Sequence, residues 1–225
     1  MVLPGKVLLW CFTRIALRGV LPITQSSTSS VEVALFARSP VIGTVKQRLA
    51  QEIGVTEALR CYHALLHTAL EATKGYCTTI WYEGRAEAWS EIAPDHRLKA
   101  QPPGDLGYKM FTALNEGAKL VVGTDIPLLS RAYIDGAIEY LLNSQDLVIG
   151  PTEDGGYCLI GMNDPSEYLF ENISWGSDRV LEQTLSRAQE LGKRVTLLPT
   201  LWDVDTSADY QRWKQEVPIN QANQI

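Results

Sequence analysis

The chain has 225 residues, of which 45% are hydrophobic and 20% are charged. A chain of this length can bury about 70% of its unfolded surface in one core, but it is too short for two full domains. The formal net charge of −6 argues against nucleic acid or an anionic membrane as a partner, although a local basic or metal-filled pocket could still bind a nucleotide. The four cysteines are scattered and form no CxxC pair, which is typical of free thiols in a reducing cytoplasm.

The first 30 residues differ from the rest of the chain. They contain Lys6, Arg14 and Arg18 but no acid, and they end in the polar run QSSTSS. Arg14 interrupts the apolar stretch well before the ~18 residues that a membrane helix needs, so we expect no membrane span. We predict a disordered or mis-called extension over residues 1–30, with a targeting peptide as the open alternative. The folded domain is predicted over 31–217 and a C-terminal tail over 218–225.

From residue 31 onward, short apolar β-forming runs alternate with helical segments. Residues 31–37 predict a buried strand, and the helix after it is expected to begin at the N-cap Thr44 and end at Gly54. The next helix is expected to begin at the N-cap Thr56 and end at Gly75. Further strands are predicted over 76–82, 97–101, 119–123, 146–150, 157–161 and 194–198, and further helices over 86–92, 105–117, 130–142, 177–191 and 207–214.

This alternation of strands and helices predicts an α/β fold. Crossover connections between strands produce a mostly parallel sheet with helices on both faces. We therefore predict a single Rossmann-like domain around a mostly parallel, mixed central sheet. In open α/β sheets ligands bind beyond the carboxyl ends of the strands, so functional residues are expected in the loops that follow strands.

The loop after the first strand is basic. It carries Arg38, Lys46 and Arg48, and Gly43 and Thr44 are expected to open a helix there. Free N–H groups at a helix start and nearby cations suit a phosphate. The loop matches neither the Walker nor the dinucleotide glycine pattern. The alternative is a solvated basic first turn, which the helix dipole disfavours.

Asp125 directly follows the apolar strand over 119–123 and precedes Pro127. A carboxylate at this position can cap the next helix, pair with an arginine, or bind a hard cation such as Mg²⁺ through oxygen. The residues alone leave these roles open.

Two further loops carry acids. The segment PTEDGG contains Asp154 before Gly155 and Gly156, and it is interpreted either as a hairpin turn or as part of a site. The segment WDVDT contains Asp203 and Asp205, which could cap the last helix, supply a metal ligand, or do both. Its likeness to the DxDxT motif of aspartyl-phosphate phosphatases is rejected, because that motif should end the first strand of its domain.

Six stretches in the same order resemble bacterial proteins of the nucleotide-diphospho-sugar transferase superfamily. These are the glycosyltransferase-A-like proteins grouped with the phospholactate guanylyltransferase of deazaflavin cofactor synthesis. The stretches span about residues 31–210, and they are FARSPVIGTVKQRLA, GDLGYKM, GTDIP, GPTEDGGYCLIG, ISWGSDRV and WDVDT.

The resemblance implies roles for particular residues. Asp125 would hold a divalent metal on the nucleotide phosphates, with Asp205 as the second acid and Asp203 as its alternative. The family more often has Lys in place of Arg38 and Thr in place of Gln47, which changes the geometry of the cation and removes a hydroxyl. The nucleotide-phosphate loop would comprise Arg38, Gly43, Thr44, Lys46 and Arg48. The residues facing the second substrate would be Gly104, Asp105, Lys109, Asp154, Gly155, Gly156 and Tyr157.

The resulting hypothesis is a cytoplasmic transferase that depends on Mg²⁺ or Mn²⁺ and acts on an activated nucleotide. Asp125, Lys46 and Asp154 are the expected catalytic residues. Glycosyl transfer from a nucleotide-diphospho-sugar to a small-molecule acceptor is preferred, and nucleotidyl transfer with release of pyrophosphate is the alternative. A catalytically inactive nucleotide-binding protein is the rival from another class. The base, the sugar, the acceptor and the oligomeric state are not determined by the sequence.

Overall fold

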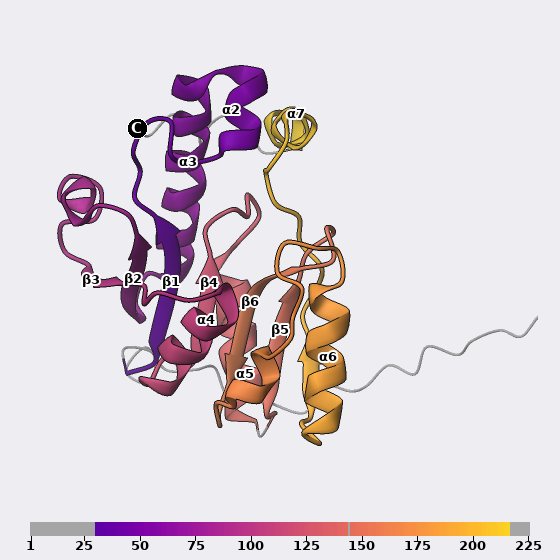
Figure 1. Cartoon of the computed structure of the whole chain (residues 1–225). Coiled ribbons are helices and arrows are strands. Elements are labelled where there is room, and N and C mark those ends of the chain that lie inside the picture. The colour runs from indigo at the N-terminus through magenta and orange to yellow at the C-terminus, as the bar shows by residue number, and fades with distance from the viewer. Residues whose placement is uncertain (1–29, 144, 217–225) are drawn as a thin grey trace, which may run out of the picture.

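A single seven-stranded sheet forms the centre of the computed structural model, which describes residues 30–143 and 145–216 (Figure 1). The predictions for the N-terminal extension, apart from Ser30, and for the C-terminal tail lie outside these residues. In sheet order the strands are β3 (Arg97–Ala100), β2 (Cys77–Glu83), β1 (Glu32–Arg38), β4 (Leu120–Gly123), β6 (Tyr157–Met162), β5 (Leu147–Pro151) and β7 (Val195–Leu197). Only β6 runs antiparallel to its neighbours, so the predicted mixed, mostly parallel sheet is confirmed.

Helices cover both faces of the sheet, and the alternation of side chains along β1 shows why. Val33 and Leu35 are fully buried in one core cluster with residues of α3 (Val55–Thr73) and α5 (Arg131–Leu142). Ala34 points to the other face and joins a cluster with residues of α4 (Leu106–Asn115) and α6 (Val180–Glu190). A strand buried on both faces is apolar along its centre, as β1 is from Val33 to Ala37.

A third apolar cluster joins the beginning of the domain to its end. Leu49 of α2 (Gln47–Ile53) and Leu65 of α3 pack with Trp202, Val204 and Tyr210, the last of which belongs to α7 (Ser207–Glu216). Figure 1 shows α2 and α7 side by side at one end of the molecule. This packing places the loop before α7 against the loop that follows β1.

Some helix boundaries differ from the predictions. Thr44 does not cap α2, because its hydroxyl donates to the carbonyl of Val41 in a turn, and Lys46 is the N-cap instead. Thr56 lies inside α3, whose N-cap is Gly54, the residue that also ends α2. The helix predicted over 86–92 is only a short 3-10 helix (Ala86–Trp89), and a second 3-10 helix (Glu167–Phe170) was not predicted.

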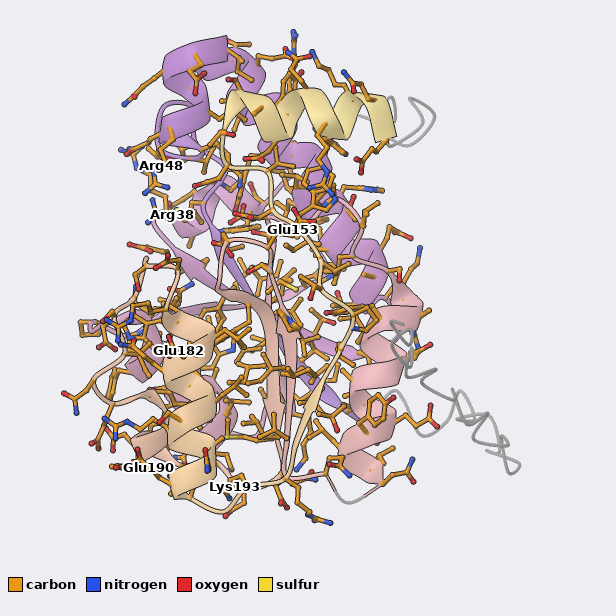
Figure 2. All side chains as sticks on the ribbon, turned by 90° about the vertical axis from the view of Figure 1, so that its right-hand side faces the viewer. Arg38, Arg48, Glu153, Glu182, Glu190 and Lys193 are labelled. Atoms are coloured by element: carbon orange, nitrogen blue, oxygen red, sulfur yellow. The ribbon has the colours of Figure 1, made fainter. Side chains whose placement is uncertain are left out.

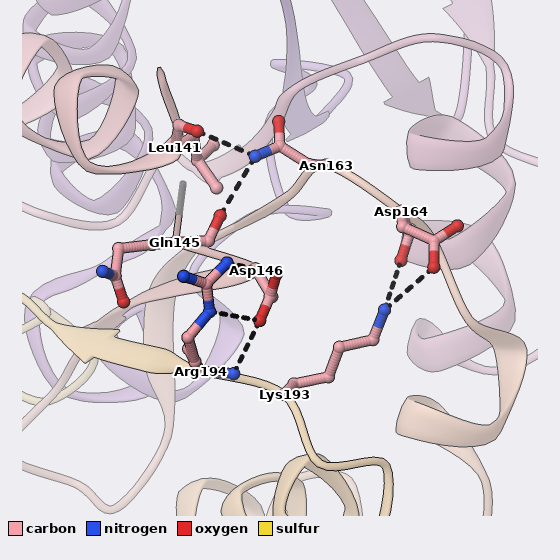
Figure 3. A network of polar contacts seen from close by, with 7 residues as sticks. All are labelled: Leu141, Gln145, Asp146, Asn163, Asp164, Lys193 and Arg194. Carbon is pink, nitrogen blue, oxygen red and sulfur yellow. Dashed lines mark hydrogen bonds and ion pairs between the residues drawn. The ribbon is translucent and has the colours of Figure 1, made fainter. Parts of the chain in front are cut away.

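The amino edge of the sheet is held by polar contacts (Figure 3). Asp146, which precedes β5, accepts hydrogen bonds from the backbone N–H and the guanidinium of Arg194, at 2.9, 3.0 and 3.1 Å. Asn163 Nδ2 donates to the carbonyls of Leu141 and Gln145. The opposite, carboxyl edge of these strands borders the cavities described below.

Within the described ranges, no helix combines the length and apolar character needed to cross a membrane. Cys61 and Cys158 are buried free thiols, and Cys77 is a half-buried one.

Candidate active site

Two adjoining cavities lie at the carboxyl edge of the sheet. The first cavity has a volume of about 630 Å³ and the second about 500 Å³. Residues that line both include Arg48, Asp125, Tyr157 and Asp205, so the two cavities meet along this group. The charged residues of the first cavity are Arg38, Lys46, Arg48, Lys109, Glu83, Asp125 and Asp205. Those of the second are Arg48, Asp125, Asp154, Asp178, Asp203 and Asp205.

The first cavity collects cations from distant parts of the chain. Arg38 ends β1, Lys46 and Arg48 lie at the start of α2, and Lys109 belongs to α4. Figure 2 shows Arg38 and Arg48 on the same side of the molecule. Glu83 ends the neighbouring strand β2, and its carboxylate lies 3.8 Å from Arg38 Nε and 3.6 Å from Lys109 Nζ. Four cations and three acids give this cavity a slight positive excess.

Asp125 is available to a ligand because another residue caps the helix that follows. The hydroxyl of Ser130 accepts a hydrogen bond from the backbone N–H of Tyr133 and caps α5. The Asp125 side chain is half-exposed, and its Oδ1 lies 2.6 Å from Lys46 Nζ. The backbone carbonyl of Asp125 accepts from the N–H of Val204 at 3.0 Å, which joins this loop to the segment before α7.

Asp205 is likewise released from helix capping. Asp209 accepts from the backbone N–H and the hydroxyl of Thr206 at the start of α7, at 2.8 and 2.7 Å. The Asp205 carboxylate instead faces the cavities, where Arg48 Nη1 lies 3.2 Å from Oδ2 and Lys46 Nζ lies 3.8 Å from Oδ1. The Thr206 hydroxyl in turn accepts from the Asp209 N–H at 3.3 Å, so the cap position before α7 is filled by Thr206 and not by Asp203 or Asp205.

The PTEDGG segment is both a hairpin turn and part of the second cavity. It connects β5 to the antiparallel β6, and Oδ1 of Asp154 accepts from the Thr152 hydroxyl at 2.5 Å and from the Gly156 N–H at 3.0 Å. Gly155 has φ 85, and a Cβ there would lie 2.1 Å from the carbonyl oxygen of Asp178. The turn therefore docks directly on the loop before α6.

The second cavity is strongly acidic, with five aspartates and one arginine along its lining. The pKa of the Asp203 carboxyl is raised to about 6, mainly by burial and secondly by the negative charge of Asp154. Glu153, next to Asp154 in sequence, lines neither cavity and instead forms a bidentate ion pair with Arg212, at 2.7 and 3.2 Å.

Several residues that line the first cavity were not predicted as site residues, among them Tyr62, Glu83 and Gln101. The Tyr62 hydroxyl donates to the Arg38 carbonyl at 2.6 Å and accepts from the Arg38 N–H at 2.9 Å, so it holds the end of β1. Burial raises the pKa of Tyr62, which keeps the phenol neutral. Glu83 pairs in register with Arg38, and Gln101 follows β3 and donates to the carbonyl of Trp81. The positions of Glu83 and Gln101 at the carboxyl ends of β2 and β3 were the available signal, whereas Tyr62 lies in α3 and had none of this kind.

Several predicted site residues line neither cavity. Asp105 accepts from the Tyr108 N–H at 2.8 Å and caps α4, and Gly104 precedes it with φ 133. Gly43 lies in the turn before α2, and Thr44 lines a smaller hollow beside Arg38. Lys109, by contrast, does line a cavity, but it is the first one and not the second.

The donor set at the junction of the cavities fits a hard cation. Within the described ranges, no group of three or more His, Cys, Asp or Glu side chains forms a self-contained metal site. The carboxylates of Asp125 and Asp205 nevertheless face the same ammonium, with Lys46 Nζ 2.6 Å from one and 3.8 Å from the other, so both acids border one point at the junction. Mg²⁺ is commonly held by one or two carboxylates together with substrate phosphates and water. The residues present suit that mode of binding.

The sheet order and the cavities at its carboxyl edge define a Rossmann-like α/β fold of the nucleotide-diphospho-sugar transferase superfamily, as the sequence resemblance implies. The chain belongs to the family described as "Uncharacterized protein conserved in bacteria (DUF2064)", whose model matches residues 65–177. No curated protein shows a significant sequence match to the chain.

Solved structures share this fold. A "putative nucleotide-diphospho-sugar transferase" from Desulfovibrio desulfuricans has a TM-score of 0.77 and 29% identity, covering 86% of this chain and 92% of the other. The manganese complex of Rv0371c from Mycobacterium tuberculosis has a TM-score of 0.51 and 17% identity, covering 84% and 100%. A 4-diphosphocytidyl-2C-methyl-D-erythritol synthase from Anaerococcus prevotii has a TM-score of 0.52 and 11% identity, covering 83% and 98%. The last two similarities concern the fold alone.

Proposed function

We propose that this protein is a Mg²⁺- or Mn²⁺-dependent glycosyltransferase that uses a nucleotide-diphospho-sugar. The observation that carries the proposal is the meeting of a cation-rich and an acidic cavity at Asp125 and Asp205. The nucleotide diphosphate would occupy the first cavity and the acceptor the second. The similarity to the Desulfovibrio desulfuricans protein supports a transferase of this class.

The cations of the first cavity would bind the diphosphate. Arg38 and Arg48 are exposed enough to reach a ligand, and a guanidinium binds phosphate oxygens in pairs. Lys46 would contribute a point charge from the floor of the cavity. A divalent cation held by Asp125 and Asp205 would neutralise charge that develops on the leaving diphosphate. The manganese complex of Rv0371c supports a metal of this kind in the fold.

The aspartates of the second cavity would orient the acceptor. In the proposed reaction an acceptor oxygen or nitrogen forms a bond to C1 of the sugar. The bond from C1 to the diphosphate breaks, and its electron pair leaves with the nucleoside diphosphate. Asp154 would take the acceptor proton through Oδ2, since Oδ1 already accepts the Thr152 hydroxyl and the Gly156 N–H.

The charge of the second cavity supports glycosyl transfer over nucleotidyl transfer. In nucleotidyl transfer to a phosphorylated substrate, the second cavity would have to bind an additional phosphate. With Asp125 and Asp205 assigned to the metal, the second cavity keeps three further aspartates, and Arg48 is the only cation among the described residues that line it. These charges oppose an anion and favour hydroxyl or ammonium donors. We therefore infer a neutral or amino acceptor. The fold shared with the erythritol synthase keeps nucleotidyl transfer as the second candidate.

The test is to incubate the protein with Mn²⁺ and a panel of nucleotide-diphospho-sugars, with and without mixtures of neutral sugars and amines. We expect release of nucleoside diphosphate that increases with acceptor. Parallel reactions with nucleoside triphosphates are assayed for pyrophosphate, whose release would replace this proposal with nucleotidyl transfer. Nucleotide binding without turnover in either assay would favour the inactive nucleotide-binding protein. Asp164→Asn, at an exposed carboxylate on the opposite edge, is the matched control for Asp125→Asn.

A further inference from the structure

Lys46 has an unusual environment for a lysine. Its side chain is 3% exposed, and its ammonium lies 2.6 Å from Asp125 Oδ1 and 3.8 Å from Asp205 Oδ1. Within the described residues Nζ makes no hydrogen bond of regular geometry, so these contacts are made by charge rather than by directed donation. Buried ammonium groups are costly unless they are fully compensated.

The backbone of Lys46 is strained as well. It has φ 48 and ψ 46, a left-handed conformation that residues other than glycine rarely adopt, and it is the N-cap of α2 without a side-chain cap. Strain of this kind persists where the surroundings enforce it, and it is concentrated at functional sites. Here the strained backbone aims the ammonium at the two acids that would bind a metal.

The ammonium and a divalent cation cannot both use these carboxylates without further negative charge. Lys46 lies on the protein side of the acids, whereas Asp125 and Asp205 are 50% and 41% exposed toward the cavities. A metal ion entering alone would meet one positive charge already in contact with its ligands, and repulsion would oppose its binding. A nucleotide diphosphate brings the additional negative charge that lets both cations stay.

We propose that Lys46 is a built-in cation that excludes the free metal ion from Asp125 and Asp205 and admits the metal–nucleotide complex. This inference rests on the proposed function and adds an order of binding to it. When the complex binds, the Lys46 side chain transfers its ammonium from the carboxylates to the phosphate oxygens in the first cavity, which it already lines. Metal and nucleotide therefore bind with positive coupling, and each strengthens the other by the same factor.

The experiment measures Mn²⁺ binding by electron paramagnetic resonance, with no nucleotide and with UDP, GDP, CDP or ADP. For the wild-type protein we expect the Kd for Mn²⁺ to fall at least tenfold with at least one of the diphosphates. For Lys46→Met, a variant of similar size without charge, we expect free Mn²⁺ to bind at least tenfold more tightly than to wild type. For this variant, addition of a nucleoside diphosphate should lower the Kd for Mn²⁺ by less than threefold.

Arg48→Met is the matched control, because Arg48 also contacts Asp205 but is 79% exposed and leaves Asp125 untouched. Its effect on free Mn²⁺ should stay below threefold. The proposal is overturned if Lys46→Met binds free Mn²⁺ no more tightly than wild type. If Lys46→Met does not fold, the wild-type titration decides, since equal Mn²⁺ affinity with and without every diphosphate overturns the coupling. Absence of Mn²⁺ binding under all conditions would instead refute the metal-dependent function, and with it this inference.

Discussion

The two cavities share a boundary but differ in charge, and strand direction explains the difference. The first cavity lies where the parallel strands β1, β2 and β3 end, and the segment from the end of β1 to the start of α2 supplies most of its cations. The second lies beside β6, whose antiparallel course brings the turn over 152–156 to the same edge. One reversed strand therefore places an acidic turn next to a basic loop, and Asp125 and Asp205 lie between them.

The largest effect should come from removing the carboxylate that both cavities share. We expect Asp125→Asn to lower kcat/KM for nucleoside diphosphate release by about 10²–10³-fold, because stabilisation of the leaving diphosphate is lost. The fold should be retained, since Ser130 caps α5. Steady-state kinetics and circular dichroism check the two parts, and a folded variant with wild-type kcat/KM would contradict the assignment.

A substitution in the turn should damage the second cavity while sparing the first. The Cβ of Gly155→Ala would collide with the Asp178 carbonyl, and the positive φ adds strain. We expect the free energy of unfolding to fall by about 2–4 kcal/mol. Gly176→Ala is the matched control, with φ +82 but open space around its Cβ, and it should cost about 1 kcal/mol. Urea unfolding measures both variants, and equal losses would show that the collision is relieved.

Single charge changes should separate the substrates of the two cavities. We expect Asp178→Asn to raise the KM for an amino acceptor about fivefold, the effect of roughly 1 kcal/mol of lost attraction, and to leave the KM for the nucleotide sugar unchanged. Glu83→Gln in the first cavity should change only the KM for the nucleotide sugar and leave the KM for the acceptor unchanged. If either substitution changes both KM values equally, the division of substrates between the cavities is wrong.

The smallest effect concerns the amino edge, away from both cavities. Hydrogen bonds from Arg194 lower the pKa of Asp146 from its ordinary value to about 2. Because the folded-state pKa is the lower one, the stabilisation is complete above about pH 4 and is lost as pH falls toward 2. Asp146→Asn should therefore reduce the decline in stability over this window and leave activity at pH 7 unchanged. Thermal melts at pH 2–5 provide the test.

Local pattern predicted most of the elements correctly, and two of the errors depend on contacts between residues that are distant in sequence. Apolar runs such as VEVALFA are compatible with a strand in a sheet that is covered on both faces. Strands β1 to β7 accordingly lie where the residues predict them. The start of α2 was misplaced because Lys46 is held in its left-handed conformation among Asp125 and Asp205, which are distant in sequence. Glu83 was missed for the same reason, since only the pairing of β2 with β1 brings it to Arg38.

The sequence by itself determined the α/β class, the mixed sheet and the identity of the acids and cations that follow its strands, because those depend on periodicity and on residue type. It left open whether Asp125 caps a helix or binds a ligand, and whether the WDVDT acids cap a helix or bind a metal. The tertiary structure decided which residues cap, by placing Ser130 and Thr206 directly before the two helices. It also decided that Lys46 lies between Asp125 and Asp205, because that contact exists only once the ends of β1, β4 and the loop before α7 meet at one edge of the sheet.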